Sequence, residues 1–204
     1  MLQKSAVILA GGFSRRFGRD KGLVVLAGKP LILHVIDRVC KAVDDVLIVV
    51  SSKDQKNKFE TILGEKANLV IDKDDSQTPL VGAITGFASA KGEYSLLLPC
   101  DAPLVSTQIV QFLLDMCANR SAAIPRWPNG YIEPLQAIYH TKSALTAAKE
   151  AFAQGNNNMQ SMIDNLRGVR YISTMVLEQL EPDLLTFFNV NTPQDLKKAE
   201  SILN

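Results

Sequence analysis

Short runs of apolar residues recur along the first half of the chain, separated by longer stretches with apolar side chains at every third or fourth position. The runs cover 6–10, 46–50, 69–71 and 94–98. A run that is apolar throughout is typical of a strand buried on both faces, as in a parallel sheet. The four runs therefore predict four parallel strands.

The stretches between these runs predict helices at 30–43, 54–63 and 80–90. The first begins with Pro30, which is well tolerated in a first helical turn. Its apolar stripe is formed by Leu31, Val35, Val39 and Val43. This alternation predicts an α/β fold that is Rossmann-like, with a mostly parallel central sheet and helices on both faces. Ligands of such sheets bind beyond the carboxyl ends of the strands.

The second half of the chain is less regular. Strands are expected at 122–126, 135–139 and 169–172, with a last short strand at 187–191, and a helix is expected at 141–153. A final helix begins after Thr192 as its N-cap, with Pro193 at the first helical position and Asp195 in the first turn. A length of 204 residues fits a single domain, 1–204.

Composition and charge argue against several classes of protein. Hydrophobic residues make up 47% of the chain and charged residues 21%, as in a soluble globular protein. The net charge is only +1, so no nucleic-acid partner is expected. No apolar run approaches the ~20 residues of a membrane span, and no signal peptide is recognised. Cys40, Cys100 and Cys117 form neither a disulfide framework nor a metal motif, which favours a cytoplasmic location.

The segment after the first apolar run contains the residue types that bind a polyphosphate. Gly11 and Gly12 lack Cβ, so the backbone can turn sharply and present N–H groups to an anion. Four cations follow, namely Arg15, Arg16, Arg19 and Lys21. Guanidinium groups suit phosphate because they donate paired hydrogen bonds. The Walker and dinucleotide glycine patterns are both absent. The alternative is a glycine-rich turn flanked by solvated basic residues.

Asp101 follows the run at 94–98 and lies between Pro99 and Pro103, which stiffen the backbone. A rigid carboxylate opposite a phosphate-binding loop is suited to Mg²⁺, which commonly takes only one or two protein oxygens. We therefore expect Asp101 to be a metal ligand. The alternative is a turn aspartate that caps a helix starting near Ser106.

Other polar residues are expected near this edge of the sheet. Ser51 follows the second apolar run and Asp72 follows the third. Asn189 and Asn191 offer amide oxygens to a metal or a ligand hydroxyl, with ordinary turn residues as the alternative. Gly82, inside a predicted helix, indicates either a close backbone approach or simple packing.

Five motifs resemble those of the nucleotidyltransferases that activate sugar phosphates and cofactors, and among these the molybdenum cofactor guanylyltransferase family. They are Leu9-Ala10-Gly11-Gly12-x-Ser14-x-Arg16-x-Gly18 with Asp20-Lys21, Pro79-Leu80-x-Gly82, Pro99-Cys100-Asp101-x-Pro103, Glu133-Pro134-Leu135 with Tyr139, and Asn189-Val190-Asn191-Thr192-Pro193. The first motif specifies only the nucleotidyltransferase superfamily, whereas the third and fifth motifs narrow the resemblance to one family within it. The resemblance covers nearly the whole chain and implies the fold of nucleotide-diphospho-sugar transferases.

By this resemblance, the chain transfers GMP from GTP to molybdopterin with release of pyrophosphate, forming molybdopterin guanine dinucleotide with Mg²⁺ as cofactor. A nucleotide-binding half, 1–105, is followed by an acceptor-binding half, 106–204. The implied catalytic residues are Arg16, Lys21 and the metal ligand Asp101. The implied nucleotide-binding residues are Leu9, Ala10, Gly11, Gly12, Lys21, Ser51, Asp72, Leu80, Gly82 and Asp101. The implied acceptor-binding residues are Asn189 and Asn191, either of which would lie near the metal or the acceptor.

One departure and several alternatives accompany the resemblance. Ser51 stands where a bacterial relative has asparagine, so one contact to the base or ribose differs. The chain could act on another base or acceptor, as a molybdopterin cytidylyltransferase or a sugar-phosphate nucleotidyltransferase does, or could be a non-catalytic module that delivers nucleotide or cofactor. The implied protein partners are transient ones, molybdoenzymes or other cofactor-synthesis proteins.

Overall fold

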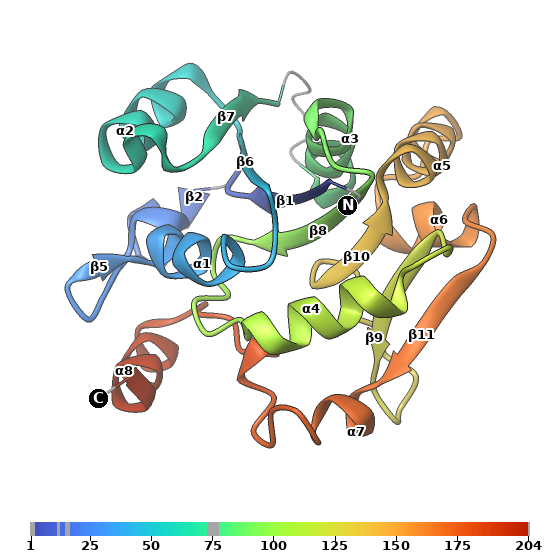
Figure 1. The fold of residues 1–204 in the computed structure, drawn as a ribbon. Coiled ribbons are helices and arrows are strands. Elements are labelled where there is room, and N and C mark those ends of the chain that lie inside the picture. Colours follow the sequence, from blue (N-terminus) through green and yellow to red (C-terminus); the bar gives the residue numbers. More distant parts are fainter. Residues whose placement is uncertain (1–2, 12, 15–16, 73–77, 204) are drawn as a thin grey trace.

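The chain folds around a seven-stranded sheet (Figure 1), in a computed structural model that describes residues 3–11, 13–14, 17–72 and 78–203. From edge to edge the strands are β11 (Val169–Ser173), β9 (Ala122–Arg126), β10 (Ala137–His140), β8 (Tyr94–Pro99), β1 (Lys4–Leu9), β6 (Asp45–Val50) and β7 (Asn68–Ile71). Strand β10 is antiparallel to both neighbours, and the other strand pairs are parallel. The mostly parallel sheet expected from the sequence is confirmed.

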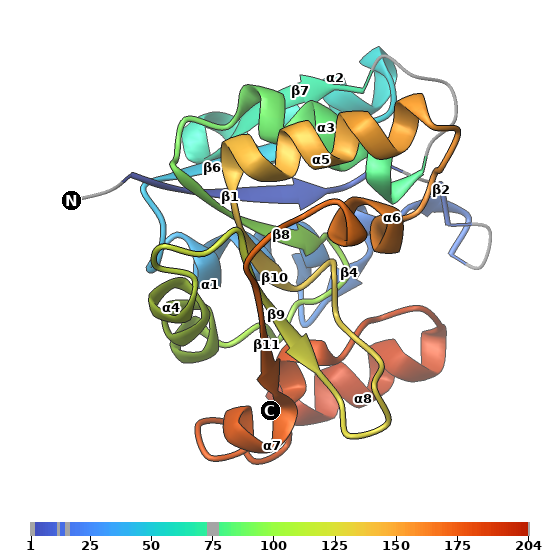
Figure 2. The same cartoon turned by 90° about the vertical axis from the view of Figure 1, so that its right-hand side faces the viewer.

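Helices cover both faces of this sheet (Figure 1, Figure 2). One face packs against α1 (Leu31–Val39), α2 (Lys53–Leu63) and α4 (Thr107–Met116), and the other against α3 (Pro79–Ser89), α5 (Thr141–Ala153) and α6 (Met159–Asp164). The short helix α7 (Thr174–Leu177) follows β11, and α8 (Pro193–Leu203) comes last. No helix among the described residues is both long enough and apolar enough to cross a membrane.

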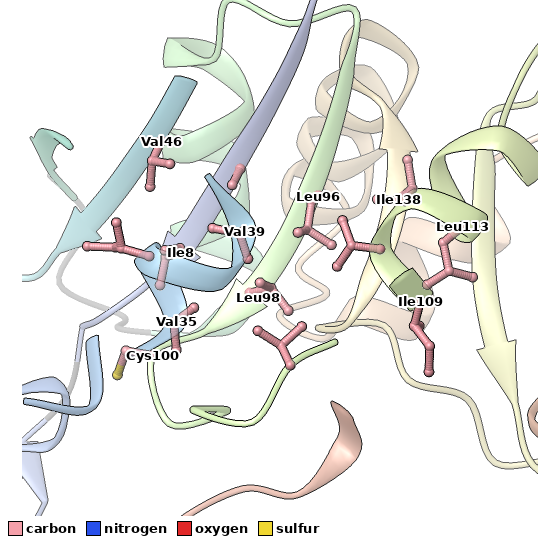
Figure 3. Packing of buried hydrophobic residues seen from close by; sticks show 14 of the residues in the cluster. Ile8, Val35, Val39, Val46, Leu96, Leu98, Cys100, Ile109, Leu113 and Ile138 are labelled. Atoms are coloured by element: carbon pink, nitrogen blue, oxygen red, sulfur yellow. The ribbon is translucent and has the colours of Figure 1, made fainter. Parts of the chain in front are cut away.

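The alternation of side chains along β1 divides the interior into two apolar clusters. Ile8 belongs to the cluster beneath α1, while its neighbour Val7 belongs to the cluster beneath α3. Figure 3 shows part of the first cluster, with Val35 and Val39 of α1 lying over Ile8. All four side chains are fully buried. The predicted parallel strand at 6–10 therefore lies at the centre of the molecule.

A third, smaller apolar cluster joins two distant parts of the sequence. It lies where α8 meets the hairpin of β4 (Val25–Leu26) and β5 (Lys29–Pro30). Its buried members are Val24, Leu26, Leu31, Val190 and Ala199. Packing of this cluster holds the segment before α8 against the segment that follows the first loop.

Three details correct the expectations. Strand β7 is at the edge of the sheet and pairs only with β6, so its side chains are partly buried or exposed. Helix α1 ends at Val39, and Pro30 is its N-cap rather than its first helical residue. No strand forms at 187–191, because Leu185–Phe187 is a 3₁₀ turn and the N–H of Val190 bonds to the carbonyl of Asp101 (2.8 Å).

Candidate active site

The loops after four strands begin at one edge of the sheet. Three backbone hydrogen bonds continue the pairing beyond the strand ends: Ala10 N to Val49 O (2.9 Å), Cys100 N to Leu9 O (3.0 Å) and Asp72 N to Val50 O (2.7 Å). Parallel strands have their carboxyl ends on the same side, so Ala10, Asp72 and Asp101 lie along this edge. The structure thus brings together residues that the sequence analysis expected there.

The first loop returns to this edge through a small hairpin. Strand β2 (Phe13–Ser14) pairs with β3 (Arg19–Asp20), and Gly18 has a φ of +64°, a conformation that glycine adopts without strain. A 3₁₀ turn, Lys21–Leu23, follows directly. This local structure places Lys21 back beside the strand ends.

Lys21 links the first loop to two other parts of the chain. Its ammonium group donates to Asp101 Oδ2, forming an ion pair, and to Asn191 Oδ1 at 2.6 Å. The backbone carbonyl of Asp101 accepts from Val190 N, which lies between the two asparagines of the fifth motif. Residues from three separate motifs therefore converge on one charged pair, and Asp101 is only 7% exposed.

Two buried oxygens at this point have no hydrogen-bond partner among the described residues. They are Asp101 Oδ1 and Asn189 Oδ1. A buried acceptor without a partner costs about 1–3 kcal/mol, so these two oxygens are suited to binding water or a ligand. Carboxylate and amide oxygens are the donors that Mg²⁺ prefers. No cluster of three or more acidic, histidine or cysteine side chains suited to a metal occurs in the described part of the chain. The residues present fit a Mg²⁺ ion held mainly by water and phosphate oxygens.

The alternative interpretation of Asp101 as a helix cap is wrong. Helix α4 begins after Ser106, whose hydroxyl accepts from Ile109 N at 3.4 Å. The carboxylate of Asp101 instead pairs with Lys21.

Asp72 and the second motif meet at the other side of the first loop. The hydroxyl of Thr85 donates to Asp72 Oδ1 at 3.0 Å. A Cβ added to Gly82 would lie 3.2 Å from Leu9 Cδ2 and 4.0 Å from Asp72 Oδ2, so the glycine permits a close approach of α3 to the end of β1. Leu80 is fully buried in the cluster beneath α3. The side chain of Leu80 therefore anchors the start of α3 in the core.

The remaining sequence-predicted residues divide into two groups. Gly11 is exposed, and a Cβ added to it would lie 3.7 Å from Ser51 Cβ, so these two residues lie next to each other at the strand ends. Gly12 and Arg16 lie outside the described residues.

One buried polar residue beside the site was not expected from the sequence. Gln55 of α2 is 3% exposed, and its side-chain amide bonds to Ala10, Ser51 and Asp20. A signal for it exists, because Gln55 is four residues before Phe59, which is four before Leu63. The three form the buried stripe of α2. A polar residue in such a stripe needs polar partners from elsewhere in the fold.

The fourth motif lies in the second half of the chain. Glu133 accepts from Trp127 Nε1 at 2.7 Å, and Trp127 packs edge-on against Phe187. Burial raises the pKa of Glu133 above its usual value, and the bond from Trp127 opposes this shift. Tyr139 is fully buried and donates to Pro134 O at 2.7 Å. Tyr139 therefore holds the loop, whereas Glu133 remains partly accessible.

Cys100 is excluded as a nucleophile although it precedes Asp101. Burial, and secondarily the charge of Asp101, raises the pKa of its thiol to about 12. The thiolate is the reactive form of cysteine, and burial of Cys100 disfavours it. The groups suited to chemistry at this site are therefore its charged and oxygen-bearing side chains.

Comparison with known proteins identifies the family. The family model described as a MobA-like NTP transferase domain matches residues 6–169. The chain belongs to this family. The match spans the first four motifs, with the first loop, Lys21 and Asp101.

Relatives within the family are similar over nearly their whole length. A molybdenum cofactor guanylyltransferase of Desulfosudis oleivorans is 33% identical over 201 residues, which cover 98% of this chain and 95% of the relative. A probable molybdenum cofactor guanylyltransferase of Pyrococcus horikoshii is 36% identical over 198 residues, covering 94% and 96%. The crystal structure of molybdopterin-guanine dinucleotide biosynthesis protein A from Archaeoglobus fulgidus has a TM-score of 0.82 and 28% identity, covering 98% of both chains. The fold and motifs of this chain are thus those of a nucleotidyltransferase.

Proposed function

We propose that the protein transfers GMP from GTP to molybdopterin, releasing pyrophosphate and forming molybdopterin guanine dinucleotide. The observation that carries this proposal is the convergence of Lys21, Asp101 and Asn191 at the strand ends, beside two buried oxygens without partners. The names of relatives that are 33% and 36% identical over nearly the whole chain support the choice of base and acceptor.

The proposed reaction is a direct displacement at the α-phosphorus of GTP. The terminal phosphate oxygen of molybdopterin forms the new P–O bond, and the bond to the leaving pyrophosphate breaks. A phosphate monoester is already anionic near neutral pH, so the site needs no strong side-chain base. It needs positioning and neutralisation of negative charge.

Each predicted residue has a role in this scheme. Lys21 and Arg16 would bind the triphosphate, and Asp72 and Ser51 would contact the nucleoside. Ala10, Gly11, Gly12 and Ser51 would form the rim of the nucleotide pocket, and Leu9, Gly82 and the buried Leu80 would support this rim. Asn191 would orient the acceptor. Asp101 would hold Mg²⁺ with the side chain of Asn189, and the bound ion would neutralise charge on the phosphates.

A substrate panel tests the proposal. Pyrophosphate release is measured with GTP, CTP or UTP, each combined with molybdopterin or glucose 1-phosphate, in Mg²⁺ and after chelation with EDTA. We expect release only with GTP, molybdopterin and Mg²⁺ together. Release with CTP alone would refute the guanylyl assignment, and release with the sugar phosphate alone would refute the acceptor. Nucleotide binding without any turnover would favour a delivery module.

The remaining expectations belong to the same proposal. In the cytoplasm the product would pass to molybdoenzymes or other cofactor-synthesis proteins through transient contacts. Affinity capture with the dinucleotide-loaded protein would test such contacts.

A further inference from the structure

The side-chain amide of Gln55 joins three segments that approach the nucleotide-binding edge from different directions. Its Nε2 donates to Ala10 O at 2.8 Å and to Asp20 Oδ1 at 3.2 Å. Its Oε1 accepts from Ser51 N at 2.7 Å and from Ser51 Oγ at 3.1 Å. One amide thus uses both of its N–H donors and its carbonyl oxygen, at 3% exposure.

An ordinary helix cap does not account for these contacts. Ser52 is the N-cap of α2 and accepts from Gln55 N at 3.1 Å, which is half of a capping box. In a complete box, the glutamine side chain would return to the N–H of the cap residue itself. Here the side chain reaches the preceding residue, Ser51, and extends its nitrogen to Ala10 and Asp20, outside the helix.

The three partners are placed so that their spacing matters to the site. Ala10 ends the β1 side of the first loop, Ser51 begins the loop after β6, and Asp20 directly precedes Lys21. Asp20 is held a second time by Lys58, at 3.2 Å. A shift of Asp20 would therefore move Lys21 relative to Ala10.

We propose that Gln55 is a positioning residue that fixes the distance between the nucleoside-binding rim at Ala10 and Ser51 and the phosphate-binding Lys21. This inference rests on the proposed function and adds to it a residue that touches no substrate. Gln55 acts through the backbone of Ala10, the backbone of Ser51 and the side chain of Asp20. A misplacement of about 1 Å in such a site reduces turnover by as much as ~100-fold.

The test uses Gln55→Met, which keeps the length of the side chain and removes its hydrogen bonds. The matched control is Ser95→Ala, which removes another buried hydrogen bond, the 2.9 Å contact with Thr141 Oγ1 near the amino end of β8. Three quantities are measured for each variant: the Kd of Mg²⁺-GTP without acceptor, kcat and KM for each substrate, and the Tm. We expect Gln55→Met to weaken nucleotide binding and lower kcat/KM for GTP by about tenfold or more. KM for the acceptor and all values for Ser95→Ala should stay within about twofold, although both variants lower Tm.

A second pair of variants tests the direction of the hydrogen bonds. In Gln55→Glu the side chain can no longer donate to Asp20, and two carboxylates face each other, so nucleotide binding should fall further than in Gln55→Met. Adding Asp20→Asn supplies a donor in the reverse direction and should recover part of the loss. A purely structural role predicts that the nucleotide Kd recovers only as far as the Tm does, whereas a positioning role predicts that the Kd recovers more than the Tm.

The outcomes separate the inference from the proposed function. If the wild type binds and converts GTP while Gln55→Met does so equally well, the positioning role is wrong. It is also wrong if the variant loses affinity for both substrates alike, as a general loss of folding would cause. If the wild type binds another nucleotide, the guanylyl proposal fails, and the same comparison with that nucleotide decides the role of Gln55. If the wild type binds none, both fail.

Discussion

In the ion pair between Lys21 and Asp101, each side chain neutralises the charge of the other at the proposed substrate site. Lys21 is also bonded to Asn191, and one oxygen of Asp101 has no partner among the described residues. Each group of the pair therefore has capacity for a further interaction. The ammonium group of Lys21 would donate further hydrogen bonds to phosphate oxygens, and the second carboxylate oxygen of Asp101 would coordinate a divalent cation.

Removing either charge should reduce turnover far more than it reduces stability. We expect Lys21→Ala and Asp101→Ala each to lower kcat by at least ~100-fold, the cost typical of losing a transition-state charge contact. The matched control is Lys29→Ala, because Lys29 forms a comparable ion pair with Asp37 on a more exposed surface. The measurement is pyrophosphate release at saturating substrate, with Tm recorded for each variant. Near-normal release by either site variant would show that its assigned role is wrong.

Among the elements, α3 packs closely on the central sheet because of its glycines. A Cβ added to Gly86 would overlap Val7 Cγ1 and lie 3.3 Å from Val49 Cγ2. The helix thus packs directly on β1 and β6, which carry the rim residues at their ends. Any displacement of α3 would also move Gly82 and Thr85 away from Asp72.

Gly86→Ala should therefore destabilise the protein despite the better helix propensity of alanine. The propensity gain is about 1 kcal/mol, whereas overpacking in a core costs roughly 1–3 kcal/mol. Because the added Cβ would overlap Val7, we expect the upper end of this cost, and therefore a net loss of about 2 kcal/mol in the free energy of unfolding, measured by urea titration. Ser89→Ala, on the exposed end of the same helix, should change it by less than about 0.5 kcal/mol. An alanine variant at Gly86 as stable as the wild type would contradict the close contact.

The elements could be predicted from the sequence wherever the signal is local. The run at 46–50 and the helix at 141–153 follow from apolar periodicity, and the observed bounds of β6 and α5 agree closely. The segment at 187–191 could not be predicted, because its backbone bonds to Asp101 rather than to a neighbouring strand. The edge position of β7 was equally hidden, since strand order depends on crossovers that periodicity does not encode.

At the scale of the whole molecule, the candidate site joins regions that are far apart in the sequence. The third apolar cluster holds Val190 and Ala199 against Val24 and Leu26, and this packing places Asn191 beside Lys21. Motif resemblance identified both asparagines and the lysine. The contact between Lys21 and Asn191 could be found only from the structure, as could the contacts of Gln55 with Ala10 and Asp20. Each contact joins two segments that are distant in the sequence, and no local pattern indicates that they meet.

Ligand binding should therefore protect two distant segments together. In hydrogen–deuterium exchange, Mg²⁺ with GTP should slow exchange in peptides covering 17–26 and 187–195, since both segments border the proposed phosphate site. Peptides covering β11 and α7, at the opposite edge of the sheet from β7, provide the control and should be unchanged. Protection confined to 17–26 would show that the asparagine segment is not part of the nucleotide site.

The same convergence has a consequence for biosynthesis. Ribosomes release chains from the amino end, so β1, β6 and β8 emerge and can pair well before Asn189 and Asn191 exist. A nascent chain that has reached only β11 contains the seven-stranded sheet and both members of the Lys21–Asp101 pair, but not the asparagines or the Val190 and Ala199 side chains of the third cluster. Catalytic competence would then arise only near the end of translation, after the scaffold has formed.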